Sequence, residues 1–97
     1  MPPYGRLAAL ILSSEDESQV DAAARAMGVA APHLEGVRVL GPAPAPLALL
    51  RGRHRRRLLL KTRREVDIQA VLQAWLATVP LPNAVRLQVD VDPYSFL

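Results

Sequence analysis

The chain has 97 residues, the length of a single domain, and it carries twelve Lys and Arg against nine Asp and Glu. It has no cysteine, which excludes disulfides and thiolate metal sites, and no apolar run approaches the ~20 residues of a membrane span. Its first residues lack the pattern of a signal peptide. We therefore expect one domain over residues 1–97, cytoplasmic and without a membrane partner.

The first third of the chain predicts a strand followed by a helix. The apolar run Leu7–Leu12 is short and continuous, which is typical of a strand that is buried on both faces. Ser14 and Glu17 then have the spacing of a helix-capping box, and an apolar stripe follows at helical spacing. We predict a helix from about Glu15 to Ala31, stopped at the latest by Pro32.

Two strands are predicted in the middle of the chain. Val37–Leu40 alternates briefly between two glycines, as a strand does. In Gly41–Pro46, three prolines at every second position favour a stiff, polyproline-like connection, read as a rigid spacer or as a peptide ligand for an aromatic groove. Leu47–Leu50 leads to a turn or bulge at Gly52, and the next strand is predicted to end near Thr62.

A helix and a last strand are predicted in the final third. Apolar residues recur at helical spacing over Ile68–Val79, with Asp67 at the favourable N-terminal end. Trp75 belongs to this stripe, so we expect it in the core rather than against a nucleic-acid base. Val85–Val91 alternates apolar and polar residues, which predicts a half-buried strand, and Asp92-Pro93 then turns the chain into its tail.

The order strand, helix, strand, strand, helix, strand predicts an α+β two-layer sandwich. This is the split βαβ, ferredoxin-like pattern, with both helices on one face of an antiparallel sheet. The first strand is apolar on both faces, so part of it would face away from the helices. Such a strip suggests that another domain or subunit covers it, with Leu10, Ile11 and Leu12 as the candidate docking residues.

Arg51–Arg64, hereafter the basic band, holds eight of the twelve basic residues and no acidic residue. The rest of the chain has four basic residues against nine acidic ones. On a strand, Leu58 and Leu60 would enter the core, and the alternate residues would lie on the opposite face about 6–7 Å apart. A phosphate partner is the leading interpretation, and a solvated edge strand protected against aggregation is the alternative. The candidate nucleic-acid-binding residues are Arg38, Arg51, Arg53, Arg55, Arg57, Lys61, Arg63 and Arg86.

Motifs for catalysis or cofactor binding are missing from the sequence. It has neither of the glycine-rich nucleotide-binding motifs, and His33 and His54 have no cysteine or close carboxylate neighbours for a metal site. Asp90 and Asp92 would share a strand face, where a salt bridge or a solvated face is the favoured interpretation and a bound cation the alternative. We therefore expect no enzyme activity, no cofactor and no metal in this chain.

Five short segments stand in one order along the chain: Pro2–Leu7, Val39–Pro44, Leu50–Arg55, Leu58–Lys61 and Val89–Pro93. Together they resemble the C-terminal domain of the PriA family, the bacterial replication-restart helicases also called primosomal protein N′. The resemblance covers essentially the whole chain. Members of that family often have an aromatic residue at one or both of the positions held here by His54 and Arg56.

The resemblance implies a function as part of a larger protein. Family members are 3′-to-5′ DNA helicases with ATPase lobes that use ATP and magnesium, a zinc-binding insertion and N-terminal DNA-binding domains. Their C-terminal domain resembles a small-subunit ribosomal protein in fold and is associated with single-stranded or branched DNA. It packs on the helicase core near the docking place of the single-stranded-DNA-binding protein. The resemblance therefore implies that this chain is a fragment of a helicase that takes part in primosome assembly.

Three functions follow as hypotheses. The first is a non-catalytic DNA-binding domain that contacts the phosphate backbone without reading bases. The second is a docking module that packs on the helicase core or on a partner protein through its apolar first strand. The third is an RNA-binding domain of the ribosomal type, which the basic band would suit equally well.

Overall fold

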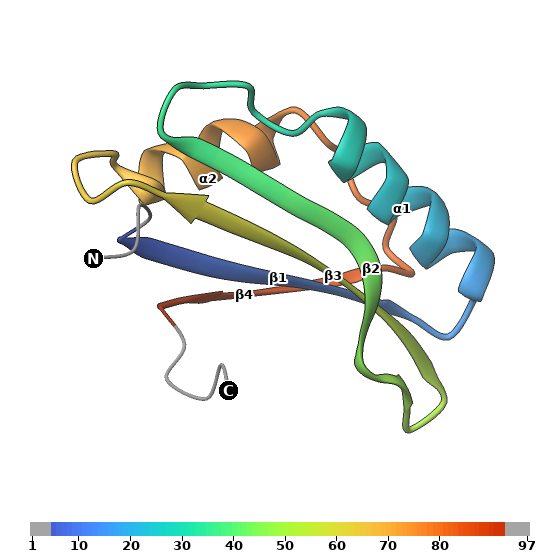
Figure 1. Cartoon of the computed structure of the whole chain (residues 1–97). Helices are drawn as coiled ribbons and strands as arrows, with labels where there is room; N and C mark the ends of the chain where they lie inside the picture. Colours follow the sequence, from blue (N-terminus) through green and yellow to red (C-terminus); the bar gives the residue numbers. More distant parts are fainter. Residues whose placement is uncertain (1–4, 93–97) are drawn as a thin grey trace.

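The computed structural model describes residues 5–92, and the predicted lead-in at Pro2-Pro3 and the tail after Asp92 lie outside the described residues. The elements are β1 (Arg6–Ser14), α1 (Glu17–Val29), β2 (Val37–Leu50), β3 (Arg53–Thr62), α2 (Ile68–Ala77) and β4 (Arg86–Val91). The four strands form one sheet in the order β2-β3-β1-β4, and every neighbouring pair is antiparallel. Figure 1 shows both helices on the same side of this sheet, which confirms the predicted α+β two-layer fold.

The strand order separates the strands that a helix connects. β3 lies between β2 and β1, and β1 lies between β3 and β4. The connection from β1 through α1 to β2 therefore passes over β3. The connection from β3 through α2 to β4 passes over β1. Because both crossovers run over the same face, no helix of residues 5–92 covers the other face. We call this second face the open face.

The core lies between the sheet and the helices. Leu10 of β1 and Leu58 of β3 are opposite each other and fully buried. Val20 and Met27 of α1 and Ile68, Val71 and Trp75 of α2 belong to the same hydrophobic cluster. The indole nitrogen of Trp75 donates a hydrogen bond of 3.0 Å to the carbonyl oxygen of Met27, so the two helices are tied together inside the core. Trp75 thus has the core position that its helical spacing predicts.

The start of α1 differs from the predicted capping box. Asp16 is the N-cap, and its carboxylate accepts hydrogen bonds from the backbone nitrogens of Ser18 and Gln19. Ser14 is instead the last residue of β1, fully buried, and its Oγ accepts from the backbone nitrogen of Asp16 at 3.1 Å. The helix therefore begins at Glu17, later than predicted, because β1 uses Ser14, and it ends at Val29, two residues before the predicted end. Asp67 does cap α2, as predicted.

The proline segment is not the separate connection that the sequence predicts. β2 runs from Val37 to Leu50 straight through it, with irregular pairing to β3 on both sides of Ala43 and Pro44. Proline cannot donate to a ladder, and this strand tolerates three prolines because it is at the edge of the sheet. At Gly41, φ is +100°, and an added Cβ would lie 2.7 Å from the carbonyl oxygen of Arg57. Glycine is therefore required where β2 bends past β3.

The turn predicted at Gly52 is confirmed. Arg51 and Gly52 alone join β2 to β3, and both have positive φ, at 53° and 78°. Two-residue turns of this kind match the twist of the strands that they join. The turn brings Leu50 opposite Arg53 and thereby sets the register at the basic end of the hairpin.

Candidate nucleic-acid interface

The basic band lies along β3, and its charges are divided between two faces. Leu58 and Leu60 are fully buried against the helices. Strand alternation therefore puts Arg55, Arg57 and Lys61 on the open face, as predicted from the sequence pattern. β3 lies inside the sheet, with β2 on one side and β1 on the other, so these side chains stand over the middle of the open face.

Arg56 belongs to the helix layer instead. Its Nε lies 2.7 Å from the Oδ1 of Asp21, and its Nη2 lies 3.0 Å from the Oε2 of Glu17, so the side chain bridges β3 and α1. Only 13% of the Arg56 side chain is exposed. Burial opposes its charge, but the hydrogen bonds and charges of Asp21 and Glu17 outweigh burial and raise the pKa of Arg56. His54 is on the same side, with Nδ1 3.7 Å from Glu17.

Two arginines of the open face are held by uncharged oxygen atoms. The Nη2 of Arg53 donates to the carbonyl oxygen of Ser13 at 2.9 Å, and its Nε donates to the hydroxyl of Ser13 at 3.2 Å. The Nη1 of Arg55 donates to the carbonyl oxygens of Pro46 at 2.6 Å and Leu47 at 3.1 Å. Such bonds orient a guanidinium without neutralising it. Both positive charges therefore stay available to an anion.

The remaining candidates surround these two. Arg38 of β2 lies opposite Lys61, and Arg86 of β4 lies opposite Ser13, so both belong to the open face. Arg51 is in the hairpin turn, and Arg63 follows the end of β3. Of the eight predicted residues, Arg63 alone has a carboxylate of residues 5–92 within salt-bridge distance, with Nη1 3.9 Å from Glu35.

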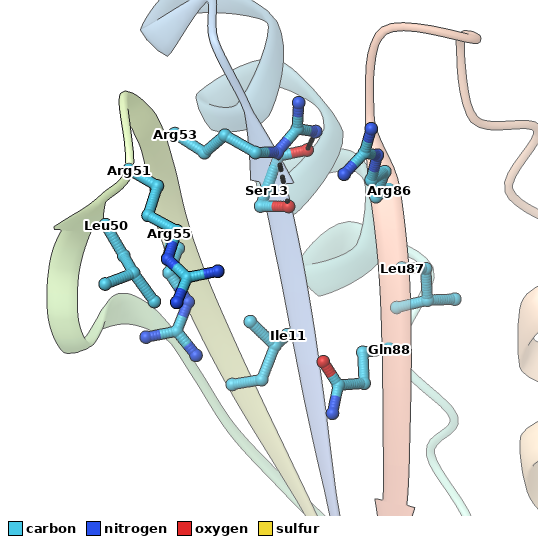
Figure 2. Close-up of a pocket in the computed structure, with 9 residues that line it drawn as sticks. All are labelled: Ile11, Ser13, Leu50, Arg51, Arg53, Arg55, Arg86, Leu87 and Gln88. Atoms are coloured by element: carbon cyan, nitrogen blue, oxygen red, sulfur yellow. Dashed lines mark hydrogen bonds between the residues drawn. The ribbon is translucent and has the colours of Figure 1, made fainter.

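A groove lies on the open face between the basic end of β3 and the start of β4. Its volume is about 360 Å³, and Ile11 and Ser13 of β1 lie between its two sides. Figure 2 shows Arg51 and Arg55 on one side and Arg86 on the other, with Arg53 bonded to Ser13. Leu50, Leu87 and Gln88 complete the lining, which contains no acidic residue. The groove is therefore an uncompensated positive site with an apolar patch.

The predicted docking residues of β1 divide between the two faces. Leu10 and Leu12 are fully buried against the helices, so they are not accessible to another domain, and the prediction is wrong for these two. Ile11 lies on the open face, because consecutive residues of a strand point to opposite sides. The apolar strip on the open face is thus formed by Leu7 and Ile11, which are partly buried, and by Ala9, which is buried.

The two aspartates at the C-terminal end have different partners. Asp92 accepts a hydrogen bond from the backbone nitrogen of Leu7 at 3.0 Å and lies 2.7 Å from the Nε of Arg6. The bond from Leu7, opposed by partial burial and reinforced by Arg6, lowers the pKa of Asp92. Asp90 lies opposite Ala9. Within residues 5–92, its carboxylate accepts one side-chain hydrogen bond, of 3.5 Å, from the amide of Gln88. Asp92 therefore has the salt bridge that the sequence favours.

The described residues hold no cluster of three or more His, Cys, Asp or Glu side chains that could ligate a metal ion. Within the same residues, neither helix has the length and apolarity needed to cross a membrane.

Several residues of the groove carry no signal in the sequence. Ser13 and the carbonyl oxygens of Pro46 and Leu47 position Arg53 and Arg55, and Gln88 and Leu50 line the groove. Their roles depend on which residues of neighbouring strands are opposite each other. A correct register for the pairs of β3 with β1 and β2 would have found them.

The comparisons with known proteins agree on one family. The family model described as the primosomal protein N C-terminal domain matches residues 1–94. The chain is 38% identical over 96 residues to the replication restart protein PriA of Rickettsia felis, covering 99% of this chain and 15% of that protein. It is 35% identical over 96 residues to the protein of the same name from Rickettsia conorii, with the same coverage. The chain is 34% identical over 96 residues to the replication restart protein PriA of Synechocystis sp., covering 97% of this chain and 11% of that protein.

Proposed function

The chain belongs to the family of primosomal protein N (PriA) C-terminal domains, and on that premise we propose that it binds DNA during replication restart. It spans about 15% of the length of the Rickettsia relatives that it matches. It is thus a small C-terminal domain and not itself a catalytic helicase, in agreement with the sequence analysis. Any helicase, ATP, magnesium or zinc chemistry is proposed for other parts of a PriA protein.

The observation that carries the proposal is the row of uncompensated charge on the open face. Arg55 and Arg57 stand on alternate positions of one strand, and Lys61 follows on the same face four residues after Arg57; none of the three has a carboxylate partner in residues 5–92. Alternate residues of a strand are about 6–7 Å apart, which is close to the spacing of phosphates along a nucleic-acid strand. Glu17 and Asp21 are on the opposite side, in the helix layer, whereas Asp90 of β4 is on the open face but is separated from this row by β1.

The expected mode of binding is insensitive to sequence. Phosphate contacts position a nucleic acid but do not identify its bases. Trp75, the one aromatic residue of the described part of the chain, is buried in the core, so it offers no stacking surface. If about four phosphates are engaged, log K falls against log salt concentration with a slope of roughly −3 for a single strand.

Fluorescence anisotropy with a labelled single strand and a labelled fork tests this proposal at low and near-physiological salt. We expect binding that weakens steeply with salt. The double variant R55E/R57E should weaken it at least about tenfold, because both charges are reversed. The matched control is R25E, the same reversal on the exposed side of α1, which should leave affinity unchanged. Unchanged affinity in R55E/R57E would refute the role of the open face.

A second candidate function is docking, and the partly buried apolar strip of Leu7, Ala9 and Ile11 on the open face favours it. The proposed occupant is the remainder of a PriA protein, with the single-stranded-DNA-binding protein and primosome proteins as further partners. Absence of DNA binding even at low salt, together with loss of assembly in the variant I11D of a full-length PriA, would favour docking. An RNA-binding function would be indicated if an RNA strand displaced a DNA strand of the same sequence at lower concentration.

A further inference from the structure

The groove between β3 and β4 differs from the rest of the basic surface. Arg57 and Lys61 lie on the same face of one strand, four residues apart. In the groove, Arg55 and Arg86 come from separate strands and lie on opposite sides of Ser13, the residue of β1 that pairs with both (Figure 2). An anion in this space meets guanidinium groups from two directions, which a flat row of charges does not provide.

Two of the four guanidinium groups that line the groove are also held in position. Arg53 is held by both oxygen atoms of Ser13, and Arg55 is held by the carbonyl oxygens of Pro46 and Leu47. Holding a donor in place lowers the conformational entropy that is lost on binding. A guanidinium also matches a phosphate with two parallel hydrogen bonds, and this fit is specific to arginine.

The groove is not wholly polar. Ile11 and Leu50 supply apolar surface beside the arginines, and the amide of Gln88 supplies a donor and an acceptor. The volume of about 360 Å³ is at the lower end of the range for small-molecule sites. This combination suits a ligand with an anionic part and a flat, partly apolar part of modest size.

We infer that the groove binds a single nucleotide unit of an unpaired DNA strand. Its phosphate lies between Arg55 and Arg86, and its base lies on Ile11 beside Gln88. The inference rests on the proposed DNA-binding function and adds a defined subsite to it. The groove would anchor one nucleotide, while the row of Arg57 and Lys61 would follow the neighbouring phosphates. A base inside a duplex is stacked and not available, so the subsite would favour single-stranded or frayed DNA over duplex.

Methyl NMR of the 97-residue chain tests the subsite directly. The sequence has two isoleucines, Ile11 in the groove and Ile68 in the core, so selective labelling gives a signal with its own internal control. Titration with the dinucleotide pTpT should shift the Ile11 methyl signal and leave that of Ile68 in place. No shift of Ile11 at saturating pTpT would overturn the subsite.

Anisotropy with a labelled single strand gives an independent test, with Arg38 as the matched control for Arg86. Both are exposed arginines on the open face, on the two edge strands. We expect R86A to weaken binding about tenfold, because a charge-assisted contact is lost, and R38A about twofold. R86K should weaken binding nearly as much as R86A, because lysine keeps the charge but not the paired donors of a guanidinium, and it should weaken binding more than R38K does.

The outcomes separate the subsite from the proposed function. Equal, small losses in R86A and R38A would overturn the subsite and leave DNA binding across the open face intact. Absence of binding by the wild type would overturn both. Thermal unfolding of each variant shows whether its fold is retained, and a variant that unfolds early is replaced by Q88A, which alters the groove without changing a charge.

Discussion

Arg55 and Arg56 are consecutive in the chain, but their guanidinium groups serve opposite faces of the sheet. Arg55 donates to the carbonyl oxygens of Pro46 and Leu47 within the sheet layer, whereas Arg56 is paired with Asp21 of α1 at 2.7 Å. One basic sequence therefore supplies both free charge on the open face and an ion pair that attaches a helix to the sheet.

This division predicts different consequences for two neighbouring substitutions. R56A should lower the free energy of unfolding by about 1–3 kcal/mol, because it removes a largely buried partner from Asp21 and Glu17. R57A should change it by no more than about 0.5 kcal/mol, because the side chain makes no ion pair in the described structure, and it should weaken DNA binding. Urea unfolding measures both, and equal stability losses would contradict the assignment of faces.

A second pair tests the two sides of β1. Leu10 is fully buried in the core, so L10A should destabilise the chain by about 2–5 kcal/mol. Ile11 is only partly buried on the open face, so I11A should cost less than about 1.5 kcal/mol. Thermal and urea unfolding of both variants would decide this. A larger loss for I11A than for L10A would mean that the faces of β1 are reversed.

A third pair compares two glycines with positive φ. G52A should destabilise the chain by about 1 kcal/mol, because the added Cβ meets no atom within 4 Å and only the backbone conformation is unfavourable. G41A should destabilise it by clearly more, because its Cβ would lie 2.7 Å from the carbonyl oxygen of Arg57. Urea unfolding gives the order, and a G41A variant as stable as G52A would show that β2 can move away from β3.

The pH dependence of stability should reflect Asp92. Its pKa is lowered in the folded state by the hydrogen bond from Leu7, against the opposing effect of burial, and by Arg6. A carboxylate with a lowered folded pKa stabilises the protein above its unfolded pKa of about 3.9, and this contribution is lost as the pH falls through the folded value.

The variant D92N tests this linkage. Its stability should lie below that of the wild type by a constant amount near neutral pH, and the difference should shrink below about pH 4. Unfolding midpoints at a series of pH values between 7 and 2.5 measure it. Curves that stay parallel over the whole range would contradict the linkage, because they would show that ionisation of Asp92 does not change the stability.

Much of the architecture could be predicted from periodicity and turn signals. The turn at Gly52, the alternation in Val85–Val91 and the helical stripe from Ile68 placed three elements within a few residues of their observed bounds. The errors have local causes. Ser14 ends a strand instead of capping a helix, and Gly41–Pro46 bends within an edge strand instead of leaving the sheet.

The sequence by itself determined which residues are charged, which residues of a strand share a face and where the turns fall. These follow from side-chain chemistry and from the regular spacing of residues in a strand or helix. It could not determine which side of Leu7–Leu12 meets the helices, since both sides are apolar. Only the tertiary structure decided which side of this segment faces the helices. It also decided which residues come together to line the groove. Ser13, Pro46 and Arg86 are far apart in sequence and meet Arg53 and Arg55 only through the register of four strands. Register is set by core packing and turn geometry across the whole sheet, which no single segment encodes.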